Sequence, residues 1–133
     1  MVTEVRKIHF GSDDLIEALT TFREQHIDFL PAGRIYIRGV ARNGMLRVQV
    51  GMTYGARTQN AIFDISDSDV LRVVIHACEN LNIPMPRIGE KTISGSEKGI
   101  CLQIKIDPNA SPKDHHVRLG DFLGAKRLET ESV

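Results

Sequence analysis

The sequence lacks tryptophan and has few aromatic residues, which make up 5% of its 133 positions. A hydrophobic core must therefore be mainly aliphatic, and the hydrophobic fraction of 41% is ordinary for a globular chain of this size. No stretch approaches the ~20 consecutive apolar residues of a membrane-spanning helix. The first ten residues also lack the apolar core of a signal peptide. These absences predict a cytoplasmic protein that does not bind membranes.

Cysteine is scarce as well. The chain contains only Cys78 and Cys101, which do not form a C-x-x-C motif. This pattern favours free thiols in a reducing compartment over a disulfide. Cys78 falls in the apolar stripe of a predicted helix, where a thiol is buried and inert. Cys101 alternates with Ile100 and Leu102 in a predicted strand, so it lies on the opposite face from those two residues.

Motifs for catalysis or cofactor binding are also missing. The sequence has no G-x-G-x-x-G or G-x-S-x-G motif, and we predict no catalytic residue and no cofactor. His115 and His116, near Asp114 and Asp121, are of residue types that bind divalent metals. Because adjacent side chains point in different directions, we predict no metal site. The sequence leaves open whether these two histidines bind a metal.

The clearest local pattern is a β-hairpin over residues 34–52, in which two alternating runs are joined by Asn43-Gly44. This dipeptide favours a two-residue type I′ turn, and that turn makes Ile35 face Met52 and Ile37 face Val50. One predicted face is apolar and carries Ile35, Ile37, Gly39, Ala41, Leu46, Val48, Val50 and Met52. The other face carries Tyr36, Arg38, Val40, Arg42, Met45, Arg47, Gln49 and Gly51.

One helix is predicted on each side of the hairpin. The first begins at Ser12 as N-cap, with two aspartates in its first turn, and ends before Pro31. The second begins at Ser66, with Asp69 at capping-box spacing, and ends before Pro84. Its predicted buried stripe consists of Val70, Leu71, Val74, Ile75, Cys78 and Leu81.

Further strands are predicted at residues 3–10, 61–65, 90–93 and 100–106, with a loop from Thr53 to Asn60. Helices and short-connected strands in this order predict an α+β domain of two layers over residues 1–107. The domain would have one mostly antiparallel sheet, centred on the Asn-Gly hairpin, with two helices packed on one face. Residues 108–133 are predicted to form a tail that is partly disordered or contains a short docking helix.

Acidic residues are absent from one long block, Phe29 to Phe63, although the whole chain carries 17 basic and 17 acidic side chains. Every basic residue in that block is an arginine. The zero net charge argues against a surface devoted wholly to nucleic acid. The arginine guanidinium, however, binds phosphate or carboxylate through two hydrogen bonds and stacks on flat rings. The predicted binding residues are Tyr36, Arg38, Arg42, Arg47, Gln49 and Arg57.

These residues predict a small non-enzymatic interaction module, which forms a homodimer or binds a protein partner through an exposed Arg/Tyr sheet face. The alternative is binding of RNA or single-stranded nucleic acid by the same face. A second alternative is a small enzyme that acts on an anionic substrate near the loop from Thr53 to Asn60, although a catalytic set is missing. The arginines also fit an ordinary solvated surface, where they form ion pairs and limit edge pairing.

Overall fold

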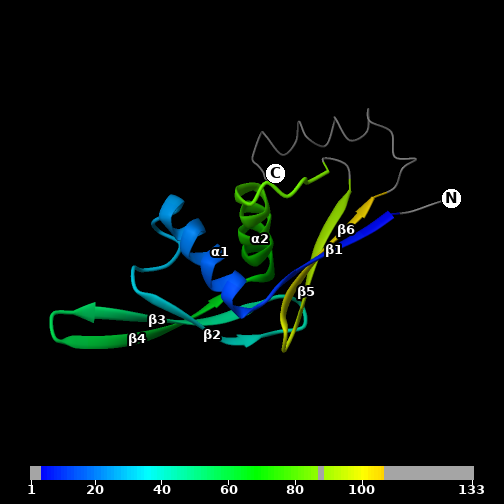
Figure 1. Ribbon diagram of the computed structural model, residues 1–133. Helices are drawn as coiled ribbons and strands as arrows, with labels where there is room; N and C mark the ends of the chain where they lie inside the picture. Colours follow the sequence, from blue (N-terminus) through cyan, green and yellow to red (C-terminus); the bar gives the residue numbers. More distant parts are fainter. Residues whose placement is uncertain (1–3, 87–88, 107–133) are drawn as a thin grey trace. The chain divides into compact units, whose positions relative to one another are not determined.

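The protein has two helices and two three-stranded antiparallel sheets, as described by a computed structural model over residues 4–86 and 89–106 (Figure 1). The elements in chain order are β1 (Glu4–Phe10), α1 (Ser12–Gln25), β2 (Arg34–Val40), β3 (Leu46–Tyr54), β4 (Arg57–Ile65), α2 (Asp67–Asn80), β5 (Glu90–Ser96) and β6 (Gly99–Ile106). The predicted α+β class is confirmed. The predicted tail, residues 108–133, lies outside the described residues.

The strands form two sheets, with orders β2-β3-β4 and β1-β6-β5. The prediction of a single sheet was therefore wrong. Strands β2, β3 and β4 pair in sequence order, as short turns favour, but β6 lies between β5 and the first strand of the chain. Pairing between strands about ninety residues apart leaves no local signal in the sequence, because it depends on contacts across the fold.

Contacts divide the chain into two compact units, and the larger one consists of residues 7–85 and 91–103. It contains both helices and the whole of the β2-β3-β4 sheet. Every contact and surface discussed below lies within this larger unit. Neither helix in the described part of the chain is long and apolar enough to cross a membrane. The assignment of residues 1–107 to one domain stays a prediction.

The core of the larger unit is mainly aliphatic, as the composition predicts. Helix α1 packs against α2 and against β2. The residues with no exposed surface include Leu15 and Leu19 of α1, Val70, Val73 and Val74 of α2, and Leu46, Val48 and Val50 of β3. The predicted stripe of α2 is rotated, because Val73 and Ala77 are buried whereas Leu81 is 63% exposed. Apolar residues surround much of this helix, so periodicity alone does not select the buried face.

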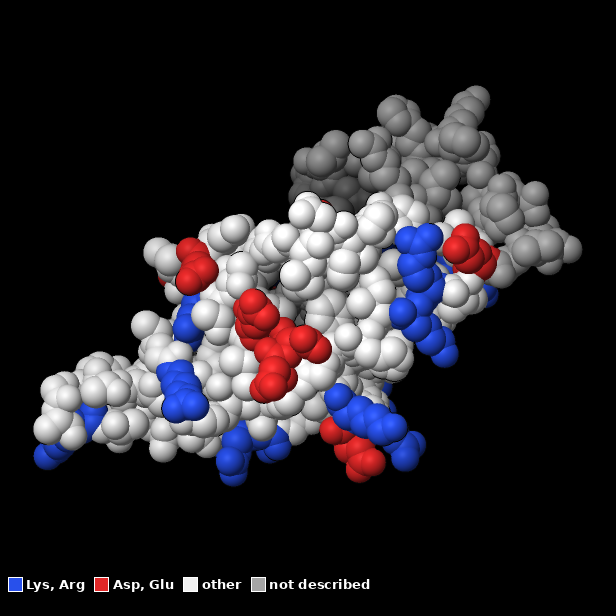
Figure 2. All heavy atoms as spheres, in the orientation of Figure 1, with Lys and Arg blue, Asp and Glu red and all other residues white. Residues whose placement is uncertain are grey.

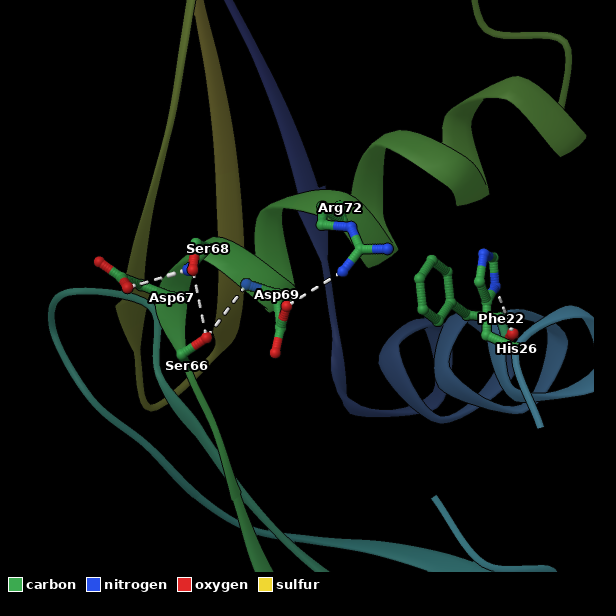
Figure 3. Close-up of polar contacts among 7 residues, drawn as sticks. All are labelled: Phe22, His26, Ser66, Asp67, Ser68, Asp69 and Arg72. Carbon is green, nitrogen blue, oxygen red and sulfur yellow. Dashed lines mark hydrogen bonds and ion pairs between the residues drawn. The ribbon is translucent and has the colours of Figure 1, made fainter. Parts of the chain in front are cut away.

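The two helix starts illustrate one wrong and one correct prediction. Gly11, not Ser12, is the N-cap of α1, and its backbone N–H donates to Asp14 Oδ2 at 2.9 Å. Ser66 is the N-cap of α2, as predicted, and its Oγ accepts from the backbone N–H of Asp69 at 3.3 Å (Figure 3). Both contacts occupy N–H groups that have no partner inside a helix.

Helix α2 ends before Pro84, as predicted, in a Schellman motif. Asn82 has φ +58°, the backbone N–H of Asn82 donates to the Glu79 carbonyl at 3.2 Å, and that of Ile83 donates to the Cys78 carbonyl at 2.9 Å. These two bonds satisfy carbonyls of the last turn, and asparagine tolerates the left-handed conformation better than most residues.

The turn between β2 and β3 has three residues rather than the predicted two. The backbone N–H of Gly44 donates to the Ala41 carbonyl, and the backbone N–H of Ala41 donates to the Met45 carbonyl, both at 2.9 Å. A type I′ turn needs positive φ at both central residues, but only Gly44 has it, at +100°, whereas Asn43 does not. Arg42, Asn43 and Gly44 therefore form the loop, and the predicted register was wrong from the turn onward.

A β-bulge at Arg38 shifts the β2–β3 register a second time. Ile35 faces Val50 and Ile37 faces Val48, whereas Val40 faces Leu46. Because Arg38 is an extra residue in β2, Val40 points to the buried side, opposite to its predicted face. The apolar identity of the buried face was predicted correctly for Ile35, Leu46, Val48 and Val50, which are buried.

Strands β3 and β4 extend through the predicted loop from Thr53 to Asn60, so that prediction was wrong. Tyr54 pairs with Arg57, leaving Gly55 and Ala56 as a two-residue turn. Gly55 has φ +63° and Ala56 has no positive φ, as in a type II′ turn, which suits the twist of paired strands.

The two sheets approach closely at Gly95, in β5. Its backbone N–H donates to the Arg42 carbonyl at 2.9 Å. A Cβ atom at this position would overlap the Ala41 carbonyl oxygen and lie 2.6 Å from Val40 Cγ1. Gly44 allows a second close approach, by the side chain of Ile93. The contact between β5 and the β2–β3 hairpin therefore depends on the absence of side chains.

Replacing Gly95 with alanine should lower the free energy of unfolding by about 1–3 kcal/mol, the usual cost of adding atoms to a filled site. Gly39→Ala is the matched control, because a Cβ there lies 3.9 Å from its nearest neighbour, Arg47 Cβ. The control should keep or slightly raise stability, by up to about 1 kcal/mol. Urea unfolding of both variants measures the difference. Equal stabilities would show that the approach at Gly95 relaxes without cost.

Candidate interaction surface

The β2-β3-β4 sheet has one face directed away from its buried residues, which we call the outer face. By alternation and pairing it carries Arg34, Tyr36, Gly39, Arg47, Gln49, Gly51, Asn60, Ile62 and Asp64. Two large apolar side chains on it are unusually open to solvent, since Tyr36 is 41% and Ile62 is 55% exposed. A sheet face that combines exposed apolar groups with arginine resembles the composition of protein interfaces.

Three cross-strand rows organise the outer face. Tyr36 pairs with Gln49, and Gln49 pairs with Ile62, so these three residues form the central row. Gly39 and Gly51 lie in the rows on either side and present only backbone. Gly39 therefore leaves one side of Tyr36 open, and Gly51 leaves one side of Gln49 open.

Arg34 lies beside Tyr36 on this face. Its guanidinium carbon lies 5.4 Å from the centre of the tyrosine ring, within the range of a cation–π interaction. The contact limits the motion of both side chains and brings positive charge to the edge of the central row. Such pre-ordering lowers the conformational entropy that binding must remove.

The row of Gly39, Arg47 and Asp64 contains an ion pair between the neighbouring strands β3 and β4. Arg47 Nε donates to Asp64 Oδ1 at 2.8 Å, and Arg47 Nη2 donates to Asp64 Oδ2 at 3.1 Å. These hydrogen bonds lower the pKa of the Asp64 carboxyl and raise the pKa of Arg47. Both groups are exposed, so solvent screens the pair and its contribution to folding stability is small. Its main effect is to orient the Arg47 guanidinium.

The structure brings together only some of the six residues predicted to bind. Tyr36, Arg47 and Gln49 share the outer face. Arg38 is exposed at the bulge, and Arg42 lies in the three-residue loop. Arg57 lies apart from the others, because alternation from Ile65 puts it on the opposite face of the sheet.

The outer-face residues that were not predicted to bind include Arg34, Ile62 and Asp64. Arg34 was counted in the arginine block, but its contact with Tyr36 is a detail of side-chain geometry. Ile62 and Asp64 come from β4, whose pairing with β3 fixes their position beside Gln49 and Arg47. The alternation of Ala61, Phe63 and Ile65 was the available signal, since it directs Ile62 and Asp64 to the other face.

A second cluster of side chains joins the end of α1 to α2. The rings of Phe22 and His26 are stacked, with centroids 4.1 Å apart, and the His76 ring meets Phe22 edge-on at 5.4 Å. The Arg72 guanidinium carbon lies 5.5 Å from the Phe22 ring centre, and Arg72 Nη1 donates to Asp69 Oδ1 at 3.3 Å (Figure 3). The ring contacts of Phe22 with His76 and Arg72 join α1 to α2, so the cluster fits a role in helix packing.

Metal ligation finds no support in the part of the chain that the structure describes, where no three His, Cys, Asp or Glu residues are placed to hold an ion. His115 and His116 lie outside the described residues, and their role stays open. Cys78 and Cys101 are both free thiols. Burial raises the pKa of Cys78, and the Glu79 carboxylate adds to this effect, as expected for the predicted inert thiol.

Charge is segregated on the face of the larger unit that Figure 2 shows. Acidic groups gather over the N-terminal part of α1, where Asp13 and Asp14 lie, and basic groups lie along β2-β3-β4. This distribution follows from the acid-free block of sequence between Phe29 and Phe63. It gives the molecule complementary charged regions.

Comparison with protein-family models, curated proteins and solved structures found no match to this chain.

Replacing Arg47 with glutamine should return the pKa of Asp64 towards the ordinary aspartate value, because the variant removes the hydrogen bonds that lower it. NMR titration of the Asp64 carboxyl measures this directly. Since its pKa is lowered in the folded protein, the pair stabilises the fold above the ordinary aspartate pKa, and this contribution is lost as pH falls through the lowered value. Arg42→Gln is the control and should leave the titration unchanged. An unchanged titration in Arg47→Gln would show that the pair does not persist in solution.

Proposed function

We propose that this protein is a small non-enzymatic interaction module that binds a protein through its outer face, and that the first partner is a second copy of the chain. The central row of Tyr36, Gln49 and Ile62 carries the proposal, because it places two exposed apolar side chains around one amide on a flat sheet. Interfaces favour such centres, in which aromatic and aliphatic groups lose contact with water.

Self-association is supported by the charges around this row. Arg34 and Arg47 supply positive charge on the outer face, and Asp64 supplies negative charge. A two-fold axis brings each residue of one copy against residues of the same face, so a face with both signs can be complementary to itself. A face of one sign would repel its copy.

The proposal includes the predicted layering, in which both helices cover the buried face of β2-β3-β4 and leave the outer face for a partner. The contact of α1 with β2, and the position of both helices on one side of this sheet in Figure 1, support it. A cytoplasmic location also belongs to the proposal, supported by the free thiols of Cys78 and Cys101.

Binding of RNA or single-stranded nucleic acid is the alternative proposal. Tyr36 could stack on a base, and exposed Arg34 and Arg38 could contact phosphates. Two features weigh against it, since Arg47 already binds Asp64 and the Asp64 carboxylate repels phosphate. The enzyme alternative places its substrate near a loop from Thr53 to Asn60. Residues 53–54 and 57–60 instead lie in paired strands, so this support for the alternative is removed.

Sedimentation of the purified protein over a wide concentration range tests self-association. We expect a reversible dimer, and Ile62→Glu should raise its dissociation constant at least about tenfold, because the glutamate would place an unpaired charge at the centre of the interface. Ile27→Glu is the matched control, since Ile27 is 81% exposed and lies outside the outer face. It should leave the dissociation constant unchanged, and circular dichroism should show the same fold for both variants.

A monomer at every concentration would exclude self-association as the function of this face. The same experiment with a labelled RNA pool then tests the alternative, which requires an affinity that falls with salt by a log–log slope of about 0.7 per phosphate contacted. Arg34→Glu should abolish such binding. If Ile62→Glu and Ile27→Glu changed the dissociation constant of the dimer equally, the dimer interface would lie outside the outer face.

A further inference from the structure

A thiol and an imidazole lie together on the β1-β6-β5 sheet, which does not contribute to the outer face. Cys101 Sγ, on β6, lies 4.0 Å from His9 Nε2, on β1, and Cys101 is partly exposed. The thiol also has the Leu102 carbonyl within 3.9 Å. The two residues are separated by 92 positions, so only the pairing of β1 with β6 brings them together.

This arrangement contains the two parts of an activated sulfur nucleophile. The thiolate, rather than the thiol, attacks electrophiles, and a neighbouring imidazole can accept the thiol proton. The sulfur–nitrogen separation is long for a hydrogen bond, but such contacts are often long in the absence of a reactant. With its own proton on Nδ1, the His9 ring presents Nε2 as the acceptor.

Cys78 supplies the contrast within the same molecule. It has no exposed surface, and burial raises its pKa, so both access and thiolate formation are disfavoured. No other pair of a free cysteine and a histidine in contact occurs among the residues that the structure describes. The two thiols therefore differ in the features that govern reactivity.

We propose that Cys101 is a reactive thiol that His9 activates, and that it exchanges with low-molecular-weight disulfides. The Cys101 proton moves to His9 Nε2, and the thiolate attacks one sulfur of the disulfide. A new S–S bond joins Cys101 to that half, the original S–S bond breaks, and the other half leaves as a thiolate that takes the proton from His9. Cys101 is oxidised and the leaving half is reduced by the same electron pair.

Charged side chains of both signs lie around His9. On one side His9 borders a hollow of about 180 Å³ that Asp14 and Glu17 of α1 also line. Lys7 precedes it by two residues on β1, and the exposed side chains of β5 in the larger unit are the neutral Thr92, Ser94 and Ser96.

The test is the reaction of the folded protein with glutathione disulfide, followed for each cysteine by peptide mass spectrometry. At pH 7 we expect a mixed disulfide at Cys101 and none at Cys78. His9→Gln should slow the reaction of Cys101 about tenfold at pH 7, and most of the rate should return at pH 9, because hydroxide can replace the imidazole as the proton acceptor. His26→Gln is the matched control, because it removes an imidazole that contacts Phe22 instead.

Three results would overturn the proposal. An unchanged rate in His9→Gln at pH 7 would remove the imidazole from the reaction. A loss of reaction rate that persists at pH 9 would show that His9 affects access of the disulfide to Cys101 rather than proton transfer. Equal modification of Cys78 and Cys101, or modification only in denaturant, would show that reactivity requires unfolding.

Discussion

The larger unit depends on the contact between β5 and the β2–β3 hairpin, where two backbones meet without a side chain between them. Gly95 donates its N–H to the Arg42 carbonyl at 2.9 Å, and Gly44 leaves space for Ile93 on the neighbouring side. Buried aliphatic residues supply most of the favourable free energy, but they are not directional. The glycine contacts supply direction, because a Cβ atom at either glycine would overlap the opposite strand.

Local elements could be predicted from the sequence, whereas their pairing could only partly be predicted. Helix α2 begins at Ser66 because the hydroxyl caps a backbone N–H, a relation between residues three apart. The hairpin register failed because two alternatives, a two-residue and a three-residue loop, use the same Asn43-Gly44 pair and differ in the φ of Asn43. The bulge at Arg38 has no sequence mark that periodicity can detect, and the second sheet requires contacts across almost the whole chain.

The same limits explain what could be predicted of the functional surfaces. Tyr36, Arg47 and Gln49 were assigned to one face because strand alternation survives small register errors. Asp64 was known as an acidic residue beyond the arginine block, but its pairing with Arg47 required the position of β4. Alternation placed Cys101 on the face opposite to Ile100 and Leu102, but nothing along the chain paired it with His9. Their proximity is a property of the fold, so no motif search along the sequence could find it.

The hairpin of β3 and β4 also has two ends with different surroundings. Near Leu46, Val48 and Val50 the strand is fully buried on one side, whereas every residue from Thr53 to Asn60 is exposed. Backbone hydrogen bonds at the exposed end can open without disturbing the core, because no packed side chain must move with them. Amide hydrogens at the tip should therefore exchange with solvent in brief local openings, while those at the base exchange only when the whole unit unfolds. In this one pair of strands, the backbone hydrogen bonds at the tip open often and those at the base open rarely.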